Sequence, residues 1–121
     1  MNVLLSIKPE FANKIFNGTK KYEFRKSIFK RDVDKVVVYA SSPVQRVIGE
    51  FTIANIICED TETVWQKTKK HSGITKDFYD EYFADKEMAF AIQIGMITLY
   101  SNPRLLTDFG LSFAPQSFAY L

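Results

Sequence analysis

Five residues near the N-terminus combine types that could do chemistry: Lys20, Lys21, Glu23, Arg25 and Lys26. A carboxylate held between cations could accept hydrogen bonds from a nucleobase edge while the cations meet phosphate. A desolvated lysine could instead serve as a general base. The same pattern also suits a solvated strand face, on which each salt bridge contributes less than about 1 kcal/mol. The segment is therefore either a polar binding floor or a solvated strand.

The residues around this segment predict the elements that position it. We expect a short apolar strand over 3–7, and then a helix that begins at Pro9 and ends at Gly18. A second strand over 20–26 would place Tyr22 and Phe24 on one face. Lys21, Glu23 and Arg25 would occupy the other face. One face could then enter a core while the other forms a site.

The remaining elements follow from hydrophobic periodicity and turn residues. After the second strand we expect a loop over 27–34, a strand buried on both faces over 35–40, a turn at 41–43 and a long strand over 46–58 with a bulge at Gly49. Two helices should follow: one is capped by Asp60 or Thr61 and ends near Gly73, and the next is capped by Thr75. The last expected elements are a strand over 88–100, a turn at Asn102-Pro103, a loop over 107–110 and an extended tail over 113–121. Few helices separate the strands, which favours an α+β, mostly β fold. Its mixed, largely antiparallel sheet would curl toward a barrel flanked by about three helices.

Size and composition indicate one domain over residues 1–121. Apolar residues make up 46% and charged residues 25%, as in an ordinary globular protein. No apolar run approaches the roughly 20 residues that span a bilayer, so we expect no membrane partner. The N-terminus lacks the pattern of a signal peptide, which predicts a cytoplasmic protein.

Charge is unevenly distributed along the chain. Residues 1–58 contain ten Lys or Arg against five Asp or Glu, whereas residues 59–121 contain six against nine. The basic excess is densest between Lys20 and Lys35. Such asymmetry is typical of a protein with an anionic partner such as nucleic acid, although a solvated, partly self-neutralised surface also fits.

Several kinds of chemistry are not expected. Cys58 and His71 are the only residues of their types, so we predict no disulfide, no metal site and no cofactor. Cys58 lies in an apolar run and should be a small buried hydrophobe. The sequence also has no phosphate-binding glycine loop and no Gly-x-Ser-x-Gly elbow.

Three motifs resemble the ASCH domain family of the PUA-like superfamily. They are the stretch Leu5-Ser6-Ile7-Lys8-Pro9-Glu10, the pattern Gly-x-Lys-x-x-Glu-x-Arg over 18–25, and the ending Ala114-Pro115-Gln116-Ser117-Phe118. That ending is similar to a branch labelled as transcriptional regulators with a PUA-like domain. The resemblance implies a small β-barrel flanked by helices, with a cleft toward which the motif strand points. It also implies binding of RNA or other nucleic acid, without a cofactor.

Another branch of the family comprises small amidohydrolases that act on a modified nucleoside. They use a Lys, a Thr nucleophile three positions later and a Glu from a later helix. The motif carries the Lys to Lys20, but Glu23 occupies the Thr position, and residues 66–72 offer no Glu. A carboxylate does not replace a hydroxyl in acyl transfer. This departure argues against that hydrolase activity.

The sequence therefore predicts a non-catalytic, RNA-binding module, for which a regulatory role is one interpretation. The predicted ligand-binding residues are Lys20, Lys21, Glu23, Arg25, Lys26, Tyr39, Ser41, Ser42, Gln116 and Ser117. An alternative is an enzyme acting on a modified nucleoside, with Lys20 and Glu23 as its acid and base. A third interpretation is a sensory or protein-interaction domain. A closed pocket would favour chemistry or reading of a single base, and an open basic groove would favour strand binding.

Overall fold

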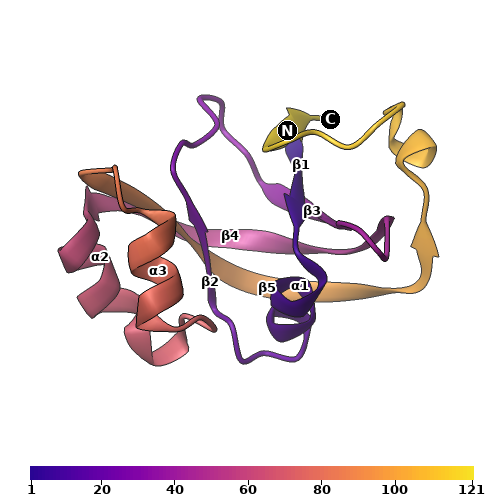
Figure 1. The fold of residues 1–121 in the computed structure, drawn as a ribbon. Helices are drawn as coiled ribbons and strands as arrows, with labels where there is room; N and C mark the ends of the chain where they lie inside the picture. The colour runs from indigo at the N-terminus through magenta and orange to yellow at the C-terminus, as the bar shows by residue number, and fades with distance from the viewer.

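The computed structural model describes residues 1–121 (Figure 1). Its strands are β1 (Asn2–Ile7), β2 (Tyr22–Arg25), β3 (Lys35–Ala40), β4 (Arg46–Asp60), β5 (Met88–Arg104) and β6 (Phe118–Tyr120). Its α-helices are α1 (Pro9–Phe16), α2 (Thr61–Thr68) and α3 (Lys76–Tyr82), and short 3₁₀ turns lie at Lys69–His71 and Leu106–Phe109. The expected order of strands and helices is confirmed.

All six strands form one curled sheet in the order β2-β5-β4-β3-β1-β6. Only β1 and β3 pair in parallel, and every other neighbouring pair is antiparallel. Figure 1 shows β1 and β2 standing side by side in front of the long β4 and β5, with α1 near the lower ends of both. The prediction of a mixed, largely antiparallel sheet that curls toward a barrel, flanked by about three helices, is confirmed.

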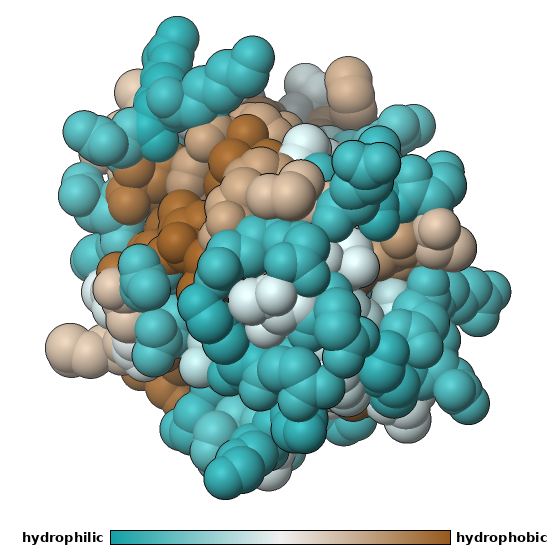
Figure 2. Space-filling model, turned by 90° about the vertical axis from the view of Figure 1, so that its left-hand side faces the viewer, coloured by the Kyte–Doolittle hydropathy of each residue, from teal (hydrophilic) through white to brown (hydrophobic).

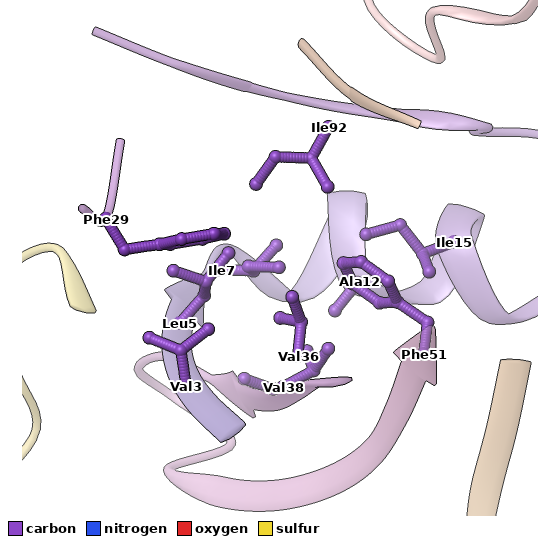
Figure 3. Close-up of a cluster of buried hydrophobic side chains, with 11 residues drawn as sticks. Val3, Leu5, Ile7, Ala12, Ile15, Phe29, Val36, Val38, Phe51 and Ile92 are labelled. Atoms are coloured by element: carbon purple, nitrogen blue, oxygen red, sulfur yellow. The ribbon is translucent and has the colours of Figure 1, made fainter. Parts of the chain in front are cut away.

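The interior of the curl is an apolar core (Figure 3). β1 contributes Val3, Leu5 and Ile7, and β3 contributes Val36 and Val38. The alternate residues of β3 enter a second cluster on the other face of the sheet, as expected for a strand buried on both faces. α1 packs its apolar stripe against the first core. Helix α1 and strand β1 are thus fixed to each other by burial.

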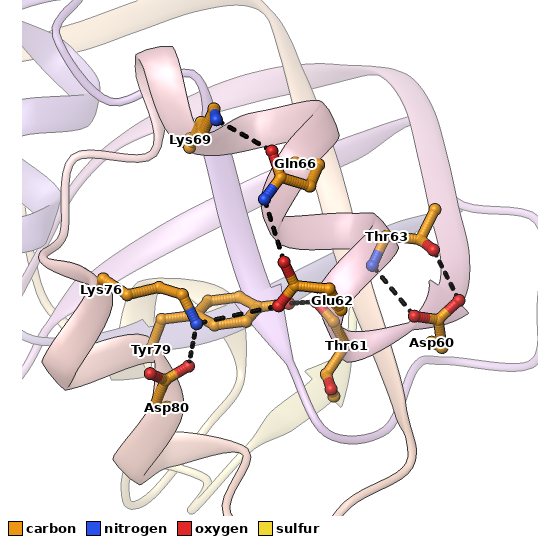
Figure 4. Close-up of polar contacts among 9 residues, drawn as sticks. All are labelled: Asp60, Thr61, Glu62, Thr63, Gln66, Lys69, Lys76, Tyr79 and Asp80. Atoms are coloured by element: carbon orange, nitrogen blue, oxygen red, sulfur yellow. Dashed lines mark hydrogen bonds and ion pairs between the residues drawn. The ribbon is translucent and has the colours of Figure 1, made fainter.

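Helices α2 and α3 pack over one end of the sheet. The aromatic ring of Tyr79 lies between Phe24 of β2 and Trp65 of α2, with ring centroids 5.3 Å and 4.8 Å away. Its hydroxyl donates to the carbonyl oxygen of Thr61 at 2.8 Å (Figure 4). Lys76 forms an ion pair with Asp80 beside this contact. The two helices therefore form one layer that holds α3 against β2.

Side-chain N-caps fix where α2 and α3 begin. Asp60 accepts a hydrogen bond from the backbone N–H of Thr63, and Thr75 accepts one from Phe78. Each cap satisfies a backbone donor that has no partner within the helix. The predicted starts of α2 and α3 are confirmed.

Three local expectations were wrong. The chain does not turn at Asn102-Pro103, because β5 continues to Arg104. β2 pairs with β5 only over 90–93, so the edge beyond is open and tolerates the missing N–H of proline. Cys58 is exposed, because strand alternation points it away from the cluster that its neighbour Ile57 packs against. Residues 106–109 form a 3₁₀ turn, where a loop was expected.

Gly49 makes room for α1. A side-chain carbon at this position would lie 2.6 Å from the ring of Phe16 and 2.5 Å from the carbonyl oxygen of Thr98. The expected irregularity is present at this point, since Val38 pairs with Gly49 and Tyr39 pairs with Val47. Ile48 is the extra residue of the bulge.

The outer face formed around α2 and α3 is mainly hydrophilic, with apolar residues gathered toward one side (Figure 2). None of the helices has the length and apolar character needed to cross a membrane.

Candidate functional site

A pocket of about 290 Å³ lies between α1, β2, α3 and the C-terminal segment. Its lining residues are Ser6, Ile7, Lys8, Phe11, Lys20, Glu23, Phe24, Arg25, Ile74, Phe78, Tyr82 and Gln116. The volume is near the lower end of the range for small-molecule sites. Aromatic side chains and charged groups thus meet in one concave space.

Lys20 is the most deeply buried charged residue of this pocket. It is 2% exposed, and its Nζ donates to the carbonyl oxygen of Ser72 at 2.8 Å. The same Nζ lies 4.8 Å from the ring centroid of Phe24 and 5.4 Å from that of Phe11. Two aromatic faces and one carbonyl therefore stabilise a cation that has left water.

Burial lowers the pKa of Lys20 to about 8, and Lys14 and Arg25 also lower it. Glu23 opposes this shift through its negative charge. The amine consequently has a neutral fraction near neutral pH that an ordinary lysine does not have. Such a group can hold a ligand as a cation or accept a proton from it.

The backbone around Ser72 and Gly73 holds the Lys20 side chain in place. Gly73 adopts a φ of +71°, and a side-chain carbon there would lie 2.5 Å from Cβ of Lys20. Lys14 donates to the carbonyl oxygen of Gly73 at 3.0 Å. The connection between α2 and α3 therefore packs directly on the lysine stem.

Glu23 and Arg25 form an ion pair on the β2 wall of the pocket. Nη2 and Nε of Arg25 lie 2.9 Å and 3.1 Å from Oε2 of Glu23. Nη2 also donates to the carbonyl oxygen of Ser6 at 2.9 Å. β1 and β2 are not paired strands, so this arginine joins them across the gap in the sheet. The Ser6 hydroxyl in turn donates to Pro115, which ties the C-terminal segment to the same place.

Two exposed lysines stand at the rim, each beside a lining ring. Nζ of Lys8 lies 5.6 Å from the ring centroid of Phe78, and Nζ of Lys26 lies 4.8 Å from that of Tyr82. Both rings belong to α3 and are nearly parallel, with an angle of 10° between their planes. The pocket therefore has an aromatic wall with a cation at each of its two rings.

The structure brings together only part of the predicted site. Lys20, Glu23, Arg25 and Gln116 line the pocket, and Lys26 reaches its rim through Tyr82. The residues that neither line the pocket nor reach its rim are Lys21, Tyr39, Ser41, Ser42 and Ser117. The binding roles themselves stay predictions.

Each residue outside the lining has a physical reason for its position. Lys21 precedes β2 and is exposed, and its backbone N–H donates to His71 at 2.8 Å. Tyr39 enters the core on the outer face of β3, because successive residues of a strand point to opposite faces. Ser41 and Ser42 lie in the turn between β3 and β4, and Ser117 offers its backbone carbonyl to Ser6.

Sequence reasoning missed the aromatic wall and Lys8. Phe11, Phe78 and Tyr82 read as ordinary apolar helix faces, since i,i+4 aromatic pairs are typical of core packing. The signal that could have found them is Lys8 immediately before Pro9, which places a cation at the start of α1.

Comparison with known proteins identifies the family of this arrangement. The family model of the ASCH domain matches residues 5–98. ATP synthase subunit alpha of Ureaplasma parvum is 34% identical over 98% of this chain, which spans only 15% of that protein's length. An ASCH domain-containing ribonuclease of Zymomonas mobilis is 33% identical over 73% of this chain, and the match covers 60% of that protein.

The fold has a solved counterpart as well. The crystal structure of ASCH from Zymomonas mobilis superposes with a TM-score of 0.90 at 28% identity. The superposition covers 99% of this chain and 87% of that one. Both the sequence and the curled sheet are therefore shared with this group.

Proposed function

Because this chain belongs to the ASCH domain family, we propose that it is a nucleic-acid-binding module that holds one nucleotide of single-stranded RNA in its pocket. The observation that carries the proposal is the pairing of aromatic wall and cations in one small concave site. Base-sized rings stack on aromatic side chains, and phosphates are attracted to lysine and arginine. A duplex would not enter, since its bases are already stacked.

Burial determines which part of the nucleotide lies inside the pocket and which part lies at its rim. The base lies inside the pocket against Phe11, Phe78 and Tyr82, where apolar walls exclude water. The neighbouring phosphates lie at the rim, near Lys8 and Lys26. A module of this kind acts by occupying its RNA, which suits a regulatory role.

Binding measurements across a salt series test this function. Fluorescence anisotropy with labelled single-stranded RNA, duplex RNA and single-stranded DNA should rank the single strands first. Replacing Lys8 and Lys26 together by Ala should weaken binding and flatten its dependence on salt, because fewer counterions are released. The charge-matched control is Lys67→Ala with Lys86→Ala, two exposed lysines outside the pocket. If none of the three nucleic acids bound at low salt, the proposal would be rejected.

A second candidate function is cleavage or modification of the bound nucleotide. Two observations favour it: the lowered pKa of Lys20, and the relative named a ribonuclease. In this case the neutral Lys20 amine would act as general base, with Arg25 stabilising developing negative charge. Incubation of labelled RNA with the wild type and with Lys20→Arg tests it. Loss of cleavage in the variant would support this role, and absence of cleavage in the wild type would reject it.

A further inference from the structure

The two carboxylate oxygens of Glu23 have different surroundings. Oε2 accepts a hydrogen bond from Nε of Arg25 and forms an ion pair with Nη2, whereas Oε1 has no protein partner. Glu23 is only 7% exposed. Every side-chain oxygen or nitrogen that is sealed from solvent has a hydrogen-bond partner, so Oε1, which has none, is not sealed. Oε1 therefore opens into the pocket that Glu23 lines. A nearly buried carboxylate oxygen with free lone pairs can accept from water or from a donor group of a ligand in the pocket.

Arg25 has one nitrogen without a protein partner. Its Nε and Nη2 are used by Glu23 and Ser6, and Nη1 has no partner. The two side chains are joined, so Oε1 is the free acceptor on the β2 wall while Arg25 stays fixed by Glu23 and Ser6. Oε1 complements a ligand edge that carries an N–H group. The Watson–Crick edges of nucleobases with an exocyclic amine carry such a group.

We propose that Glu23 Oε1 accepts a hydrogen bond from the exocyclic amino group of a nucleobase, and that it selects bases bearing such a group. The inference rests on the proposed function and adds to it the orientation of the nucleotide. The base edge points inward to Glu23, and the phosphates stay outside.

The charge of Glu23 favours an amine over the other groups of a nucleotide. A phosphate placed at Oε1 would meet a like charge in a site of low dielectric, which is unfavourable. A carbonyl oxygen there would bring two acceptors together without a proton. An amino group instead donates one N–H to Oε1, in a charge-assisted bond that is stronger than a neutral one.

Two pairs of nucleosides differ only in the exocyclic amine and so test the inference directly. They are guanosine with inosine, and adenosine with purine riboside. Titration calorimetry with the wild type should show that the amine-bearing member binds about tenfold more tightly in at least one pair, the effect of one charged hydrogen bond. Equal affinities within both pairs, or no binding of any nucleoside, would overturn the inference without requiring a variant.

Glu23→Gln assigns the effect to this side chain. Its amide oxygen can still accept from Arg25, which leaves its NH₂ group facing the pocket, so the advantage of the amine should disappear. The matched control is Glu87→Gln, an exposed carboxylate outside the pocket, which should keep the advantage. An advantage that persists in a folded Glu23→Gln variant would contradict the role of Glu23.

The proposed function and this inference fail separately. RNA binding that depends on Lys8 and Lys26, together with no discrimination between the paired nucleosides, would retain the module and reject the amine contact. Discrimination of nucleosides without any binding of RNA would retain the amine contact and reject the RNA module.

Discussion

Arg25 of β2 donates from Nη2 to the carbonyl oxygen of Ser6 in β1 at 2.9 Å, across the gap where the curled sheet has no strand pairing. One side chain therefore performs two tasks. It joins the two strands that border the pocket, and it neutralises Glu23 inside the pocket. The candidate pocket is thus built at the seam of the fold, and the proposed ligand contacts and the stability of the fold depend on the same residues.

Replacing Arg25 by Met should be strongly destabilising. It leaves the Glu23 carboxylate buried without its partner, a change that typically costs about 3–5 kcal/mol. Chemical denaturation of the wild type and the variant measures the loss. The double variant Arg25→Met with Glu23→Gln should recover part of it, because the unpaired charge is gone. A loss below about 1 kcal/mol for Arg25→Met would show that the seam does not depend on this pair.

Gly73→Ala should be more damaging than Gly110→Ala, although both glycines have positive φ. An added methyl group at Gly73 meets the Lys20 stem, whereas nothing lies within 4 Å of the corresponding position at Gly110. We expect a loss of about 2–4 kcal/mol at Gly73, and of about 1 kcal/mol at Gly110. Thermal unfolding compares them. Equal losses would mean that only backbone strain matters and that Lys20 moves freely.

The pH dependence of folding stability should reveal the lowered pKa of Lys20. The pKa is about 8 in the folded protein against 10.5 for an ordinary lysine, so the unfolded chain binds more protons between these values. Folding stability from this group therefore rises as pH rises from 8 toward 10.5, by up to about 3 kcal/mol. The stability of the wild type minus that of Lys20→Met isolates the effect. A difference that stays constant over this range would indicate an unperturbed lysine.

Phe78→Ala should weaken the binding of single-stranded RNA by about 1–3 kcal/mol, because a stacking surface for the base is lost. Phe78 also packs edge-on against Phe11, so unfolding must be measured beside binding. Phe113→Ala is the matched control, since that ring is 80% exposed and lies outside the pocket. Similar affinities for the two variants would argue against stacking on α3.

The order of elements could be predicted from the sequence because local signals agree with burial. Pro9 and Gly18 bound α1, and Asp60 and Thr75 cap α2 and α3. Such signals operate within a few residues. The length of β5 could not be predicted, because its tolerance of Pro103 depends on how far β2 extends as its neighbour.

The part of the candidate site on β2 could be predicted from the sequence, whereas the parts that other elements contribute could not. Alternation placed Glu23 and Arg25 on one face, and the structure pairs them there. The sequence does not show that the segment 72–74 covers Lys20, or that α3 supplies an aromatic wall to β2. Both facts depend on contacts between residues about fifty positions apart, for which local periodicity carries no information.

The location of bound RNA is the most direct test of the central claim. Amide and aromatic NMR resonances of labelled protein, followed during titration with a short single-stranded RNA, report where the ligand lies. We predict that the largest changes occur at Phe11, Lys20, Glu23, Phe78 and Tyr82, which line the pocket. Changes confined to the opposite end of the sheet around Tyr100 and Arg104, with the pocket resonances unmoved, would contradict it.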